Sequence, residues 1–95
     1  MSKLSELEIA AQMPAAKGWD RLGDMLVRTW QFPSFRRAIE FTNHVAGLME
    51  KTDHYPELIV NYRTVRIEMS THDVGGLSER DFSLIAEINE IPTDR

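Results

Sequence analysis

Residues 58–69, LIVNYRTVRIEM, decide the fold because they contain two successive runs with an alternating side-chain pattern. In an extended chain alternate residues face the same side, so the pattern predicts two consecutive strands. The connection at residues 62–64 is too short for a crossover, and strands joined in this way pair antiparallel. The segment therefore predicts a β-hairpin and, with it, an antiparallel sheet.

A long helix is expected ahead of the hairpin, from Pro33 to about Thr52. Apolar side chains recur there at every third or fourth position, which is the spacing of one helix face. Pro33 suits the first helical turn, where its missing N–H would have no partner. The expected apolar stripe consists of Phe35, Ala38, Ile39, Thr42, Val45, Ala46 and Met49.

Two further strands and a short helix are expected nearer the N-terminus. Residues 4–13 fit a short amphipathic helix, which Pro14 should end. Residues 17–20 form a turn into a short extended piece, and residues 24–32 alternate well enough for a strand.

A third helix is expected after the hairpin. Ser78 and Asp81 have the spacing of an N-cap and an acidic first turn, and Pro92 ends the helix. Leu84 and Ile85, with Ile88, provide its buried face. The order α-β-β-α-β-β-α predicts an α+β fold, a four-stranded antiparallel sheet with helices packed on one face.

Composition limits the classes of function. Ninety-five residues suffice for one packed unit, so we expect a single domain over residues 1–95. The absence of cysteine excludes disulfides and cysteine-bound zinc and fits a reducing cytoplasm. A net charge of -4 without a basic stripe argues against nucleic-acid binding. We expect neither a signal peptide nor a membrane span, since no long apolar run occurs.

Two of the three histidines are placed where chemistry is usually built. His54 follows the long helix and His72 follows the last strand, and element ends often carry functional side chains. Imidazoles titrate near neutrality, as proton transfer requires. On spacing alone, a solvated or hydrogen-bonded loop histidine is the commoner explanation for each. His44 lies within the long helix, and we assign it a structural role.

Two blocks of residues resemble the signature of a known family. Residues 50–57, EKTDHYPE, look like a Glu-Lys pair followed by a His-His-Pro tripeptide, with Tyr55 in place of the second histidine. Residues 70–81, STHDVGGLSERD, are similar to the second block of Thr-His, Gly-Leu-Ser/Thr and Asp. Trp19 and the Phe32-x-x-Phe35 start of the long helix also look like family positions. The chain thus resembles the pterin-4a-carbinolamine dehydratases.

The resemblance implies a lyase that removes water from a 4a-hydroxytetrahydropterin to give a quinonoid dihydropterin, in tetrahydrobiopterin-type cofactor recycling. The step needs a proton delivered to the departing hydroxyl and a proton taken from N5, so two positioned imidazoles are a sensible minimum. No metal and no organic cofactor is required. Family members are dimers or tetramers, so we expect at least a homodimer.

The resemblance also implies the site residues. His54 and His72 would be the acid/base pair, with Asp81 supporting the site as a third catalytic residue. Residues implied to bind or shape the substrate are Glu50, Tyr55, Pro56, Thr71 and Asp73.

Tyr55 leaves two functions open. Tyrosine is a poor base at pH 7, so an active dehydratase needs this position for binding rather than for proton transfer. The alternative is a weak or inactive dehydratase-like protein that binds a protein partner, as dimerisation cofactors and RuBisCO assembly factors do.

The remaining features have ordinary explanations. Arg36 and Arg37 are expected to solvate a helix face, although a basic patch for a partner is the alternative. Trp30 and Phe32 are expected in the core rather than stacked on a pterin.

Overall fold

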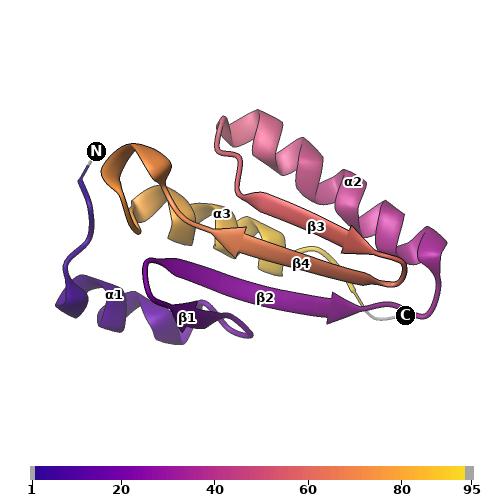
Figure 1. Ribbon diagram of the computed structural model, residues 1–95, viewed down its shortest axis with the longest axis horizontal. Coiled ribbons are helices and arrows are strands. Elements are labelled where there is room, and N and C mark those ends of the chain that lie inside the picture. Colours follow the sequence, from indigo (N-terminus) through magenta and orange to yellow (C-terminus); the bar gives the residue numbers. More distant parts are fainter. Residues whose placement is uncertain (1, 94–95) are drawn as a thin grey trace.

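Helices and strands follow one another as expected in the computed structural model, which describes residues 2–93. The ribbon in Figure 1 shows a sheet with α2 and α3 behind it and α1 beside β1. The order α-β-β-α-β-β-α and the α+β fold class are confirmed. The elements are α1 (Glu6–Gln12), the 3-10 helix η1 (Met13–Ala15), β1 (Asp20–Leu22), β2 (Met25–Gln31), α2 (Phe35–Thr52), β3 (Glu57–Asn61), β4 (Thr64–Met69), the 3-10 helix η2 (His72–Val74) and α3 (Glu79–Asn89).

The sheet is antiparallel throughout, with the strand order β1-β2-β4-β3. Strands β3 and β4 form the expected hairpin, in which Asn61 pairs with Thr64 across the turn. Tyr62 begins this turn at a φ of 55°, in the left-handed region that bulky residues rarely adopt. Strand β3 is left at one edge of the sheet, with β4 as its neighbour.

One face of the sheet is covered by α2 and α3, and the other is open (Figure 1). The side chains of β4 alternate between the two faces of the sheet. Val65, Ile67 and Met69 are fully buried in the core, whereas Arg66 and Glu68 are only partly buried on the open face. The period of two in the sequence therefore reports one covered face and one solvated face.

The start of α2 differs from the expectation. Its N-cap is Ser34, whose side chain accepts a hydrogen bond from the Arg37 backbone N–H, so Pro33 precedes the cap and is outside the first turn. Phe35, the first residue of the helix, is 52% exposed. Phe41 is buried instead, with its ring centroid 4.7 Å from that of Trp30. The placement of Phe35 in the buried stripe was wrong, because Phe35 is the first residue of α2 and its ring lies beside that of the exposed Tyr62, with 6.5 Å between the centroids, instead of in the core.

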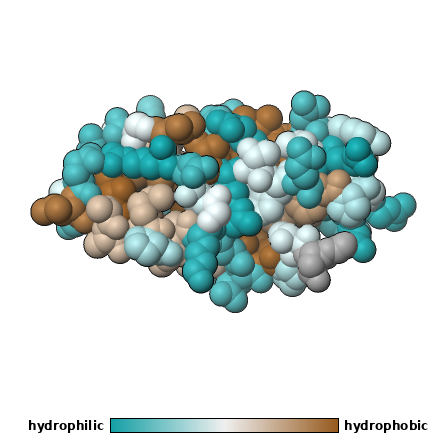
Figure 2. Space-filling view, turned by 90° about the horizontal axis from the view of Figure 1, so that it is seen from below, coloured by the Kyte–Doolittle hydropathy of each residue, from teal (hydrophilic) through white to brown (hydrophobic). Residues whose placement is uncertain are grey.

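Helix α1 is peripheral. Ile9 is its single buried residue, while Leu7 is 84% exposed. Figure 2, which shows the side of the molecule below the sheet in Figure 1, mixes hydrophilic and hydrophobic residues, with hydrophobic ones gathered toward the α1 end. No helix among the described residues is long and apolar enough to span a membrane.

Candidate active site

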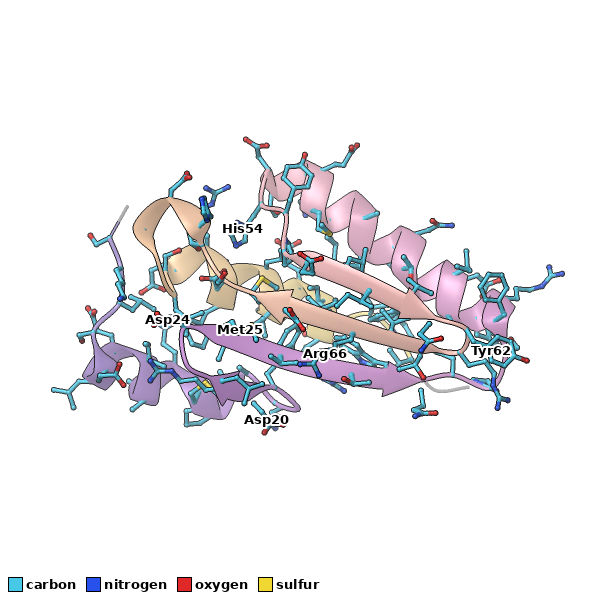
Figure 3. The ribbon with its side chains drawn as sticks, viewed as in Figure 1. Asp20, Asp24, Met25, His54, Tyr62 and Arg66 are labelled. Atoms are coloured by element: carbon cyan, nitrogen blue, oxygen red, sulfur yellow. The ribbon has the colours of Figure 1, made fainter. Side chains whose placement is uncertain are left out.

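A pocket of about 410 Å³ lies at the end of the sheet where β2 and β3 begin and β4 ends. Figure 3 shows His54 and Met25 at this end of the molecule and Tyr62 at the opposite end. The pocket is lined by Met25, Asp53, His54, Tyr55, Pro56, Glu57, Glu68, Ser70, Thr71, His72, Asp73 and Arg80. Its walls thus come from three strands, the two loops that follow α2 and β4, and the first turn of α3.

The end of α2 determines where His54 lies. Asp53 adopts left-handed angles, φ 55° and ψ 41°, and its backbone N–H bonds to the Met49 carbonyl, which closes the helix. The chain then turns inward, so His54 is 7% exposed. The Arg80 guanidinium from α3 donates hydrogen bonds to the Thr52 and Asp53 carbonyls, the Thr52 contact at 3.4 Å. These contacts satisfy carbonyls that a helix C-terminus otherwise leaves unpaired.

Asp81 anchors the His54 ring from behind the pocket. Its carboxylate is fully buried, and Oδ1 is 2.7 Å from His54 Nε2. Oδ2 accepts hydrogen bonds from the Thr71 hydroxyl at 2.8 Å and from the Ser78 backbone N–H at 2.9 Å. An ionised carboxylate only accepts, so Nε2 carries the proton of this contact and Nδ1 is the ring nitrogen left for the pocket.

The same carboxylate joins the loop after β4 to the start of α3. Ser78 and Asp81 form a capping box at the α3 N-terminus, as their spacing predicted. The Thr71 hydroxyl lies 2.7 Å from the Ser78 hydroxyl, and it donates its own proton to Asp81. Ser78 therefore donates to Thr71, and each hydroxyl proton in this buried chain has a defined acceptor.

His72 reaches the pocket from the other loop. It begins η2, and a bridge between Thr71 and Gly76 closes the loop that carries it. Gly75 within this loop has a φ of 69°, which glycine adopts without strain. His72 is exposed, whereas His54 is buried, yet both line one pocket.

Most of the expected site residues gather here. His54, Tyr55, Pro56, Thr71, His72 and Asp73 line the pocket. Tyr55 lies there with 59% of its surface exposed. Asp81 is not a lining residue and acts on the pocket through His54. Glu50 is exposed on the last turn of α2 and is also absent from the lining.

Sequence reasoning missed several lining residues. Glu57 and Glu68 occupy polar positions of alternating strands, a pattern that usually marks solvent-facing side chains. Their position in the pocket follows from the β3–β4 register, which places Glu57 directly opposite Glu68 and which the sequence pattern does not show. The other lining residues missed are Met25, Asp53, Ser70 and Arg80. Between Ser2 and Thr93, no group of three or more His, Asp or Glu side chains has the arrangement of a metal site.

Known proteins similar in sequence point to one family. The family model described as Pterin 4 alpha carbinolamine dehydratase matches residues 2–91. A protein of Chloroflexus aurantiacus named "Putative pterin-4-alpha-carbinolamine dehydratase" is 44% identical over 91 residues, 96% of this chain and 98% of the relative. A Thermomicrobium roseum protein of the same name is 40% identical over 91 residues, with the same coverage.

Two solved structures are similar to this chain in fold. The crystal structure of a transcriptional coactivator/pterin dehydratase from Brucella melitensis has a TM-score of 0.88 at 29% identity, covering 93% of this chain and 96% of that one. A pterin dehydratase-like protein, identified as a RuBisCO assembly factor in the alpha-carboxysome, has a TM-score of 0.67 at 22% identity, covering 79% and 89%. The second likeness concerns the fold alone.

Proposed function

The chain belongs to the pterin-4-alpha-carbinolamine dehydratase family, and from this premise we propose that it dehydrates a 4a-hydroxytetrahydropterin. The products are water and a quinonoid dihydropterin, as in the recycling of a tetrahydrobiopterin-type cofactor. The observation that carries the proposal is that His54 and His72, which are 18 residues apart in the sequence, line one pocket.

In the proposed mechanism, His54 is the base that takes the N5 proton. Its Nε2–H donates to Asp81, so the lone pair on Nδ1 is available to the pocket. When Nδ1 accepts a proton the ring becomes an imidazolium, and the buried Asp81 carboxylate stabilises that charge. Asp81 thus orients the ring and does not itself exchange a proton.

His72 is the proposed acid. Loss of water from C4a requires the C–O bond to break as the hydroxyl oxygen is protonated, while the electrons of the N5–H bond form the C4a–N5 double bond. His72 is exposed on the loop after β4, so it regains its proton from water after each turnover. Thr71 and Asp73, with Pro56 and Tyr55, are proposed to shape the pocket around the flat ring.

The test is the rate of dehydration of a 4a-hydroxytetrahydropterin, followed as the quinonoid product forms. We expect His72→Ala to lower kcat by about 100-fold or more, the contribution typical of a positioned acid or base. The matched control is His44→Ala, because His44 is exposed on α2 and is not among the residues lining this pocket. A wild-type protein that gives no acceleration over the uncatalysed dehydration, with His72→Ala behaving identically, would reject the enzyme.

The alternative is a binding or assembly role on the same scaffold. Tyr55 favours it, because a histidine is usual at that position in the family. The dehydration assay separates the two functions, since an assembly factor gives no acceleration with or without His72.

We further propose a homodimer formed through the free edge of β3. This strand is unpaired on its outer side within the sheet of residues 2–93. Its central residues are apolar, with Ile59 38% and Val60 37% exposed. An exposed apolar edge strand offers unpaired backbone groups to another strand, and a second copy of β3 meets that need.

A further inference from the structure

Two glutamates, Glu57 and Glu68, face each other across neighbouring strands, an arrangement that does not stabilise the sheet. Glu57 on β3 is directly opposite Glu68 on β4, and both line the pocket. Their chain neighbours Leu58 and Ile67 pack in or against the core, so the two glutamates project from the open face of the sheet. Like charges directly opposite each other destabilise an antiparallel pair. Local conflicts of this kind concentrate at functional sites.

The two carboxylates differ in their partners. Glu68 Oε2 accepts a hydrogen bond from Arg66 Nε at 2.9 Å, and Arg66 lies mid-sheet on the open face (Figure 3). Glu57 has no hydrogen bond or ion pair from its side chain to any residue in the described range. One member of the pair is therefore neutralised within the sheet, and the other remains available to a ligand.

A second observation points to a ligand in this pocket. The His54 side chain is 8% exposed and lines the pocket, yet its Nδ1 has no hydrogen-bond partner within residues 2–93. Buried polar atoms nearly always have a hydrogen-bond partner, and this nitrogen is available to accept a hydrogen bond from a molecule in the pocket. Met25 and Pro56 add apolar lining for a flat ring.

We propose that Glu57 recognises the hydrogen-bond donor edge of the pterin, which is its 2-amino group and N3–H. A carboxylate accepts two parallel N–H bonds, and such charge-assisted pairs are both stronger and more specific than neutral ones. This edge belongs to the aminopyrimidinone ring, whereas N5 and the 4a-hydroxyl react on the other side of the bicycle. The inference rests on the proposed function, because it names the part of the substrate that the same site selects.

The proposal predicts discrimination against lumazines, in which a carbonyl replaces the 2-amino group. A carbonyl oxygen facing Glu57 would place two hydrogen-bond acceptors opposite each other. The carboxylate would then have no donor from the ligand at that position. Glu57 is thus a specificity residue and takes no part in proton transfer.

The experiment compares the binding of a 7,8-dihydropterin and the matching 7,8-dihydrolumazine by titration calorimetry. The wild-type protein is expected to bind the dihydropterin at least about 10-fold more tightly. Glu57→Gln should weaken dihydropterin binding by about 10-fold to 100-fold and narrow the preference over the dihydrolumazine. The control Glu40→Gln, an exposed change on α2, should leave both affinities unchanged.

Unfolding by urea separates recognition from a structural role. Removal of the repulsion with Glu68 should leave the midpoint of Glu57→Gln equal to or higher than that of the wild type. Equal dihydropterin affinity in wild type and Glu57→Gln overturns the inference, as does a lowered midpoint with both ligands weakened alike. Neither result bears on the dehydratase proposal, which the His72→Ala assay tests separately. A wild type that binds neither compound overturns the inference about Glu57 and also counts against the dehydratase proposal.

Discussion

At the scale of single residues, Tyr55 occupies the position at which the resemblance to the family implies a second histidine. The structure places it in the pocket lining with 59% of its surface in solvent. A side chain so exposed interacts with a ligand through water as well as directly, and its net contribution to binding is small. The proposed proton-transfer residues are His54 and His72, which line the same pocket.

Tyr55→His is therefore expected to change kcat by less than about threefold and KM by less than about fivefold. The control is Tyr62→His, since Tyr62 is 66% exposed at the other end of the molecule. Steady-state kinetics on the 4a-hydroxypterin measure both constants. A gain in kcat of about 100-fold would show instead that this position moves a proton and that tyrosine has impaired it.

Element by element, the start of α3 connects folding to the site. The Ser78 capping box does more than end a helix, because the same residues hold Thr71 and orient His54 through Asp81. Ser5 forms a capping box of the same type at the start of the peripheral α1. The two caps have the same hydrogen-bond pattern, but only the α3 cap is connected to pocket residues.

Ser78→Ala is expected to lower the free energy of unfolding by about 2 kcal/mol, because it removes a cap and leaves the buried Thr71 hydroxyl with one partner fewer. It should also lower kcat, since the support of Asp81 is disturbed. Ser5→Ala, at an exposed cap, should cost less than about 1 kcal/mol and leave kcat unchanged. Urea unfolding and the dehydration assay provide both readouts. Equal effects of the two changes on kcat would contradict the link between the cap and the site.

For the molecule as a whole, the single core and the apolar edge of β3 stand out. A single cluster of buried residues takes side chains from all three α-helices and from the sheet, which supports the single domain that we propose for the chain. The open sheet face carries the pocket at one end, and the outer side of β3 remains free. The free edge is where the proposed homodimer forms.

Light scattering coupled to size exclusion is expected to show a dimer at micromolar concentration. The double substitution Ile59→Lys and Val60→Lys should convert it to a monomer, because charge on an edge strand opposes strand pairing. The double substitution Leu7→Lys and Leu22→Lys serves as the control, since both leucines are exposed and lie outside β3. A wild type that elutes as a monomer would contradict the proposed interface.

The sequence by itself determined the order of elements, the hairpin and the α3 cap. These follow from local rules: a period of two or near 3.6, and a serine three residues before an acid. The choice of His54 and His72 as site residues came from the resemblance to the family and stays a prediction. The start of α2 escaped those rules, because Pro33 and Ser34 both suit a helix start and only the Ser34 contact with Arg37 decided between them.

Only the tertiary structure decided which side chains share the pocket. Glu57 and Glu68 become neighbours through the β3–β4 register, and Arg80 meets the end of α2 through helix packing. The polar ring of His54 can be buried because Asp81, on another helix, accepts its Nε2–H. Local patterns specify the conformation of each segment, whereas contacts between distant segments depend on how the covered sheet face and the helices bury their apolar surface together.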